Sequence, residues 1–142
     1  MLVLIQIGIG SALLLACAMV HILIIAKMIR HLKAGNHFAP DKTRIHQIMT
    51  VCFLFLGAIL SHTLHIYISA LSLWMLGALP GYEKPIYFAL VTYTTLGYGD
   101  LVLTEQFRIL GAMISVTGIL MFGMTTAFLV SIFARVLADD AR

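Results

Sequence analysis

Charged side chains are scarce in this sequence. Asp, Glu, Lys and Arg make up 11% of the 142 residues, and 61% are hydrophobic, whereas soluble domains contain about 25% charged and about 45–50% apolar residues. A chain of this length cannot bury so much apolar surface inside itself, which excludes an ordinary cytosolic domain and a disordered chain. The formal net charge is only +3, which excludes a polybasic nucleic-acid binder.

Cysteine is also scarce. The two cysteines, Cys17 and Cys52, both lie in apolar runs, which excludes a disulfide-stapled secreted domain and favours buried, inert thiols. The N-terminal sequence MLVLIQIGIG lacks the basic residues of a secretory signal, and few residues follow the last apolar run. We therefore expect no signal peptide and no attached nucleotide- or calcium-binding domain.

What the sequence does contain is three long apolar runs, at residues 2–26, 47–79 and 107–137. About 20 apolar residues suffice for one helical membrane crossing. The runs therefore predict an all-α membrane protein with three transmembrane helices. The second run is too long for one crossing, so we expect its helix to end at residue 72 and an exposed turret-like connection to follow at 73–84.

The segment between the first two runs is basic. Residues 27–46 contain five of the nine Lys and Arg residues and the loop-forming Gly35 and Pro40. Basic loops favour the cytoplasmic side of a membrane. We therefore predict a cytoplasmic loop in a multi-pass protein of the cell membrane, with the N-terminus outside and the C-terminus in the cytoplasm. A lipid-binding patch in this loop is an alternative.

The most specific segment is PIYFALVTYTTLGYGD, at residues 85–100. Residues 85–95 suit a helix half as long as a membrane crossing, with Pro85 at its first position, and the glycines at 97 and 99 break it. Irregular backbone at membrane depth must be buried in protein or line a watery cavity, which predicts a re-entrant loop. Alternate glycines allow successive carbonyls to point to one side and replace the water around a cation. One loop supplies few oxygens, so several copies must surround an axis.

This segment resembles the selectivity-filter signature of the potassium channel family. Residues 95–100, TLGYGD, carry the signature, residues 82–95 are similar to the pore-helix segment of the small bacterial two-transmembrane-helix channels, and residues 118–127 are similar to their inner helix. The resemblance implies a potassium channel pore domain at 47–142 (outer helix 47–72, turret 73–84, pore helix 85–95, filter 95–100, inner helix 107–137), preceded by an additional helix at 1–26.

The resemblance also implies the function and the site. It implies a homotetramer around a four-fold axis, set among membrane lipids, that passes potassium passively and selectively and is not an enzyme. The family's ion-binding filter maps onto Thr95, Leu96, Gly97, Tyr98 and Gly99. Potassium would be bound by the carbonyls of the first four and the Thr95 hydroxyl. No cofactor is implied beyond the bound potassium ions.

Other residues near the filter bear on its rigidity. The resemblance places Asp100 at the outer mouth and implies that Tyr98 braces the filter against the pore helix. The sequence departs from the family at Val91, where some bacterial channels carry a Glu that partners the filter Asp. Tyr87 could instead offer its hydroxyl to Asp100. Leu96 replaces the commoner Val.

Two glycines and three histidines inside the apolar runs allow several interpretations. Gly118 and Gly123 fit a gating hinge or close helix packing. His62 and His65 are three residues apart and share one helix face, and His21 lies in the first run. The histidines fit neutral packing residues, a pH sensor formed by His62 and His65, or a transition-metal site.

These patterns leave alternatives to a selective channel open. The pore could be a weakly selective cation channel, which the intact TLGYGD sequence disfavours. The chain could be a non-conducting regulatory subunit of a larger complex, or a channel that needs a separate regulatory subunit. An intramembrane metal site formed by His21, His62 and His65 is the alternative from another functional class. None of the apolar runs carries Arg or Lys at every third position, so we expect no voltage sensor of the charged-helix type.

Overall fold

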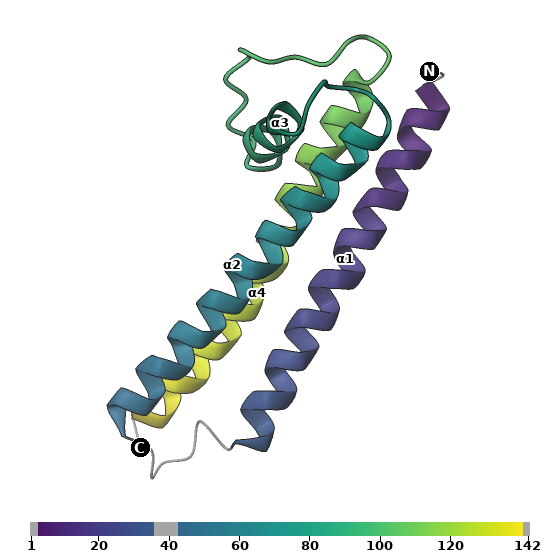
Figure 1. Cartoon of the computed structure of the whole chain (residues 1–142). Coiled ribbons are helices and arrows are strands. Elements are labelled where there is room, and N and C mark those ends of the chain that lie inside the picture. The colour runs from purple at the N-terminus through teal and green to yellow at the C-terminus, as the bar shows by residue number, and fades with distance from the viewer. Residues whose placement is uncertain (1–2, 36–42, 141–142) are drawn as a thin grey trace.

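In a computed structural model, which describes residues 3–35 and 43–140, the chain folds into three long helices and one short helix (Figure 1). The long helices are α1 (Val3–Ala34), α2 (Arg44–Met75) and α4 (Arg108–Asp140), and the short helix is α3 (Glu83–Tyr93). Helix α1 packs against both α2 and α4. Helix α3 lies at the end of the bundle where α2 finishes and α4 begins, and it contacts both of them.

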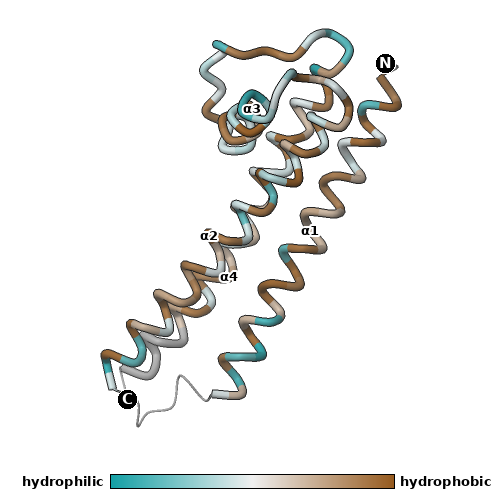
Figure 2. The backbone as a smooth tube through the Cα atoms, viewed as in Figure 1, coloured by the Kyte–Doolittle hydropathy of each residue, from teal (hydrophilic) through white to brown (hydrophobic). Residues whose placement is uncertain are grey.

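Each long helix contains a segment long and apolar enough to cross a membrane. A helix of 32 residues, the length of α1 and α2, measures about 48 Å, and a bilayer core is about 30 Å thick. Large apolar side chains are exposed along all three helices, and hydrophobic residues follow each of them along most of its length (Figure 2). The predicted all-α class with three membrane helices is confirmed.

Helix α1 continues beyond the predicted boundary at residue 26, so the first part of the expected 27–46 loop is helical. The physical reason is packing. Met28 and Leu32 are one turn apart on α1 and pack with Leu54 of α2 and Ile132 of α4 in a buried cluster. Lys27, Arg30 and Lys33 lie in this last part of α1. Long basic side chains can reach a membrane surface from such a position.

Helix α2 is also longer than the predicted 47–72 segment. It begins at Arg44, where the Thr43 hydroxyl accepts a hydrogen bond from the His46 amide at 3.4 Å. It ends in a Schellman motif, because the Ala78 amide donates to the Leu73 carbonyl at 2.9 Å and Gly77 adopts a φ of 66°. The first residues of the expected 73–84 connection therefore belong to the helix.

Helices α3 and α4 differ slightly from their predicted bounds. Helix α3 begins at Glu83, so Pro85 occupies its third position rather than its first. Proline is tolerated there because the amides of the first turn have no partner within the helix. Helix α4 begins at Arg108, one residue later than predicted. The amides of Ile109 and Leu110 in its first turn donate to Oε1 of Gln6 on α1, at 3.0 and 3.3 Å.

All four helices meet in one hydrophobic core near α3. Its buried members are Leu13, Leu73, Tyr93, Leu110, Ile114 and Met121. Tyr93 is the last residue of α3 and is fully buried. The core therefore holds the C-terminal end of α3 in place, and the segment that follows α3 starts from a fixed point.

Candidate functional site

The predicted filter residues form a loop that leaves the buried end of α3. Residues 94–100 are all exposed in the single chain, and the loop runs along the α3 end of the bundle before α4 begins (Figure 1). Their backbone is irregular, with no strand pairing among the described residues.

The start of the loop is a Schellman motif at the end of α3. The amide of Thr95 donates to the Thr92 carbonyl at 3.0 Å, and the amide of Leu96 donates to the Val91 carbonyl at 3.0 Å. The Gly97 amide reaches the same Val91 carbonyl at 3.3 Å. In such a motif the residue after the cap is left-handed and is usually glycine. Here it is Thr95, with a φ of 60°.

Left-handed conformations then recur at alternate residues. The φ angles of Thr95, Gly97 and Gly99 are 60°, 56° and 78°. In an ordinary strand successive carbonyls alternate between two sides, whereas left-handed residues at alternate positions allow successive peptide groups to face one side. The two glycines accept this conformation without cost, which the sequence predicted. The same conformation at Thr95 was not predicted.

The end of the loop near Asp100 is hydrogen-bonded back to α3. The hydroxyl of Tyr87 donates a hydrogen bond to Oδ2 of Asp100 at 2.7 Å, as the sequence suggested. This hydrogen bond raises the pKa of the Tyr87 phenol above its ordinary value of 10.0. Tyr98 is 67% exposed in the single chain, and its bracing of the loop against α3 stays a prediction. A cavity of about 250 Å³ lies between the loop and α3, lined by residues that include Tyr87, Val91 and Asp100.

Helix α4 packs closely behind α3. The Ser115 hydroxyl donates to the Thr92 carbonyl at 3.0 Å, and a Cβ at Gly118 would collide with the carbonyl oxygen of Tyr93. The structure therefore gives Gly118 a packing role, one of the two interpretations of its sequence position. A Cβ at Gly123 would meet nothing within 4 Å. The hinge role of both glycines stays a prediction.

The three histidines of the apolar runs come together beside Tyr93. Nδ1 of His62 and Nδ1 of His65 each lie 2.9 Å from the Tyr93 hydroxyl. His21 of α1 lies beside both, with ring centroids 5.7 Å from His62 and 5.3 Å from His65. Among the described residues no group of three His, Cys, Asp or Glu side chains is placed to hold a metal ion. The structure therefore gives the metal-site alternative no support.

Two hydroxyl side chains complete this cluster, and sequence reasoning missed both. Nε2 of His62 and Nε2 of His21 lie 2.9 and 3.2 Å from Oγ1 of Thr125 on α4. Nδ1 of His21 lies 2.8 Å from Oγ of Ser61 on α2. The i, i+3 spacing of His62 and His65 signals a shared face, but nothing in the sequence marks Tyr93, Thr125 or Ser61 as its partners.

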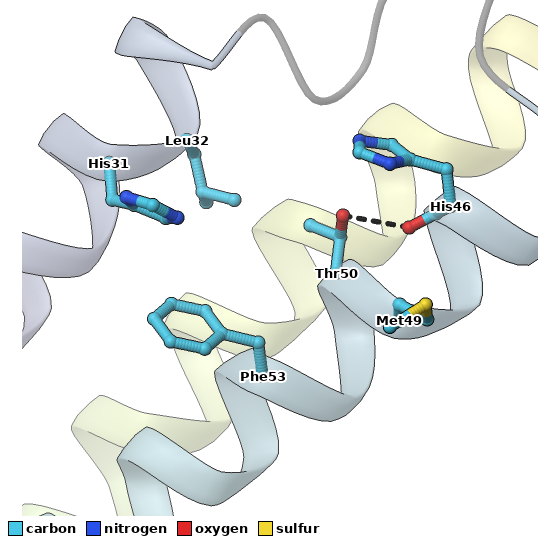
Figure 3. A pocket seen from close by; sticks show the side chains of 6 residues that line it. All are labelled: His31, Leu32, His46, Met49, Thr50 and Phe53. Carbon is cyan, nitrogen blue, oxygen red and sulfur yellow. Dashed lines mark hydrogen bonds between the residues drawn. The ribbon is translucent and has the colours of Figure 1, made fainter.

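A second histidine pair lies at the opposite end of the bundle. His31 near the end of α1 and His46 near the start of α2 line a pocket of about 230 Å³. Leu32, Met49 and Phe53 supply its apolar side chains, and Thr50 donates to the His46 carbonyl at 2.9 Å (Figure 3). This pocket is remote from the loop at 94–100.

The fold and the loop together define a multi-pass membrane protein with an irregular segment, left-handed at alternate residues, between its last two candidate spanning helices. Residues 61–135 match the sequence profile of the ion channel family, a family of membrane channels with two transmembrane helices per subunit. The chain belongs to this family and carries α1 as an additional N-terminal helix. Ion channels transport ions passively and are not enzymes. The chain matched no curated protein and no solved structure.

Proposed function

We propose that the chain is the subunit of a potassium-selective channel, which lets potassium cross the cell membrane passively through a homotetrameric pore. Membership of the ion channel family supports the transport function. The observation that carries the proposal is the alternation of left-handed residues at Thr95, Gly97 and Gly99. It falls within the TLGYGD sequence, which resembles the potassium-channel filter signature.

In this proposal the loop at 95–99 is the filter. Potassium must lose its water on entering, so backbone oxygens must replace it. The carbonyls of Thr95, Leu96, Gly97 and Tyr98 and the hydroxyl of Thr95 would supply these oxygens. Gly99 would complete the conformation and Asp100 would lie at the outer mouth, held by Tyr87. One loop supplies one side of a coordination shell, and four loops around an axis supply a complete one.

Helix α3 would serve as a re-entrant pore helix. Its 11 residues span about 16 Å, which is roughly half of the bilayer core. A helix carries partial negative charge at its C-terminal end, and the C-terminal end of α3 leads directly into the loop. That charge would favour a cation beneath the filter.

The remaining elements take their places around this pore. Within the proposed pore domain at 47–142, α2 would be the outer helix and α4 the inner helix, with Gly118 and Gly123 as candidate hinges. The basic residues Lys27, Arg30 and Lys33 lie near the end of α1, away from α3. The preference of basic residues for the cytoplasmic side would put this end inside the cell and the filter toward the outside.

The test is ion flux into liposomes that contain the purified chain, measured with potassium and with sodium. The informative variant is Gly97→Ala, because alanine adopts a φ of 56° only with strain, at a cost of roughly 1–2 kcal/mol. Gly77→Ala is the matched control. Gly77 has a φ of 66°, and like Gly97 it has no atom within 4 Å of an added Cβ, but it lies in the turn after α2.

We expect potassium flux at least about tenfold above sodium flux in the wild type. Gly97→Ala should lose that flux, and Gly77→Ala should retain it. Equal flux of the two ions would contradict the proposed selectivity. An equal loss in both glycine variants would show that general destabilisation, rather than the filter, explains the effect.

A further inference from the structure

The histidine cluster beside Tyr93 joins all four helices through polar contacts. His21 comes from α1, Ser61, His62 and His65 from α2, Tyr93 from α3 and Thr125 from α4. Of these side chains all but His62 are at least nine-tenths buried. Tyr93 is two residues before Thr95. The cluster therefore lies directly behind the start of the proposed filter.

The hydrogen bonds of this cluster can be assigned by counting protons. Oγ1 of Thr125 lies 3.0 Å from the Met121 carbonyl, which can only accept, so the hydroxyl proton of Thr125 goes there. Oγ1 must then accept from Nε2 of both His21 and His62. A neutral imidazole carries one proton, so Nδ1 of each of these rings is an acceptor.

The rest of the assignment follows. Nδ1 of His62 accepts the proton of the Tyr93 hydroxyl, and Nδ1 of His21 accepts that of Ser61. The Tyr93 hydroxyl has then given its only proton, so Nδ1 of His65 must donate to it. Every one of these contacts is satisfied with three neutral rings. Nε2 of His65 then remains as a buried lone pair that accepts no hydrogen bond, on a ring that lies beside the Cys17 backbone.

We propose that Tyr93 is a positioning residue for the filter, held by this neutral histidine cluster, and that one proton taken up by the cluster at acidic pH releases it and lowers potassium flux. The proposal rests on the proposed channel function. It goes beyond that function by naming the site that controls flux and the chemistry that does so.

A further proton disturbs this network of hydrogen bonds. A proton on Nε2 of His65 charges a buried ring, with the Cys17 backbone as its nearby acceptor. A proton on Nδ1 of His62 leaves the Tyr93 hydroxyl between two donors, with no acceptor for its own proton. Either proton also places a positive charge among rings whose centroids are 5.3 to 5.9 Å apart. A buried donor or charge without a partner is costly, so the contacts that hold Tyr93 should rearrange.

No carboxylate, lysine or arginine side chain of the described helices faces the cluster. From α1 the titratable groups are His21 and Cys17, from α2 they are His62 and His65, and from α3 the group is Tyr93. Helix α4 has no titratable side chain between Arg108 and Arg135 and contributes Thr125. Imidazole is the group among these whose ordinary charge change lies near neutral pH. The histidines are therefore the groups that respond.

The first measurement is independent of conduction. Nitrogen NMR of the full chain with labelled histidines distinguishes the two neutral tautomers from the charged ring. At about pH 8 we expect the Nε2–H tautomer for His21 and His62 and the Nδ1–H tautomer for His65, assigned with single His→Asn variants. Three Nε2–H tautomers, or a ring already charged at this pH, would overturn the proposal even in a chain that conducts.

The second measurement is potassium flux into liposomes between about pH 8 and about pH 4, because a charge among these buried rings is costly and is taken up only at distinctly acidic pH. We expect wild-type flux to fall about tenfold over this range. Tyr93→Phe removes only the hydroxyl that both imidazoles contact, so its flux should already be low at the higher pH and change less than about twofold.

His65→Asn separates a titrating role from a merely structural one. The asparagine amide keeps a donor near the position of Nδ1 but cannot gain a proton. We expect wild-type flux at the higher pH and a fall of less than about threefold at the lower pH, because one of the two proton-accepting positions is gone while His62 can still take up a proton. His31→Gln, in the remote pocket of Figure 3, is the matched control and should keep the wild-type pH profile.

The outcomes separate the two proposals. Selective potassium flux that does not change with pH would overturn the cluster proposal and leave the channel intact. An equal weakening of the pH response in His31→Gln and in His65→Asn would also overturn it. Absence of flux at every pH would count against the channel, and the tautomers would then decide whether the neutral cluster exists.

Discussion

Thr95 adopts a backbone conformation that residues branched at Cβ rarely adopt. Its φ is 60°, in the left-handed region where a threonine is strained by roughly 1–3 kcal/mol. The surrounding contacts enforce this conformation, because the amides of Thr95 and Leu96 both bond back to the last turn of α3. The strained residue is the first of the proposed ion-binding row, so the end of α3 sets the direction in which the row begins.

The other end of the proposed row is held by a side-chain hydrogen bond from Tyr87 to Asp100. Tyr87→Phe removes the oxygen and keeps the ring. We expect the ratio of potassium to sodium flux to fall about threefold, as suits the loss of one exposed hydrogen bond, because the outer carbonyls become less well fixed. Flux in liposomes with each ion alone measures this ratio.

Tyr82→Phe is the control for this substitution, because Tyr82 packs on Trp74, with ring centroids 5.2 Å apart, and not on the loop. An equal fall in both variants would contradict a specific role for Tyr87.

The raised pKa of Tyr87 fixes the sign of the pH dependence of its hydrogen bond. The phenol is protonated below its ordinary value of 10.0, so the hydrogen bond is present there and is lost only as the pH rises through the raised pKa.

At the scale of elements, α1 supplies a hydrogen-bond acceptor for the first turn of α4. Gln6 is 1% exposed and accepts from the amides of Ile109 and Leu110. Gln6→Leu leaves these amides without that acceptor, at about 1–3 kcal/mol for a buried donor. We expect the free energy of unfolding to fall by about 2 kcal/mol, measured by reversible unfolding in mixed micelles.

Gln106→Leu is the matched control for Gln6→Leu. Gln106 is exposed just before α4, so the same chemical change there should leave the free energy of unfolding within about 0.5 kcal/mol of wild type. Equal stability of the two variants would mean that the first turn of α4 obtains its cap elsewhere and that α1 does not support α4 in this way.

Much of this arrangement of elements could be predicted from the sequence. Hydropathy alone locates the three membrane helices, and glycine spacing alone locates the left-handed positions at 97 and 99. The ends of the helices could not be predicted as well, because they depend on partners distant in sequence. The end of α1 is helical since Met28 and Leu32 pack with Leu54 and Ile132, which no local pattern reveals.

The candidate site likewise could be predicted only in part from the sequence. The sequence placed His62 and His65 on one face and suggested Tyr87 as a partner for Asp100. It could not identify Tyr93, whose aromatic ring in an apolar helix looks like an ordinary core residue. Its hydroxyl gains meaning only when α2 brings two imidazoles to within 2.9 Å. Propensity and periodicity describe one element at a time, whereas such a cluster depends on the packing of four.

At the scale of the whole molecule, one chain leaves the proposed pore incomplete. The loop at 94–100 is exposed along its full length, and large apolar side chains such as Val116, Ile119 and Phe122 are exposed on α4. Lipid can cover an apolar helix, but it cannot satisfy a row of carbonyls. Copies of the same loop around an axis would do so, and closed symmetry is the common solution for identical chains.

Mixing subunits tests how many chains one pore requires. Wild-type and Gly97→Ala chains co-expressed in equal amounts assemble at random if the substitution leaves assembly intact. If four intact loops are needed, only about one sixteenth of the pores conduct, whereas independent single-chain pores would retain about half of the flux. We expect the lower value, measured as potassium flux per chain in liposomes, and full flux when Gly77→Ala replaces Gly97→Ala in the mixture. Retention of half the flux would contradict a shared filter, because each chain would then conduct through a loop of its own.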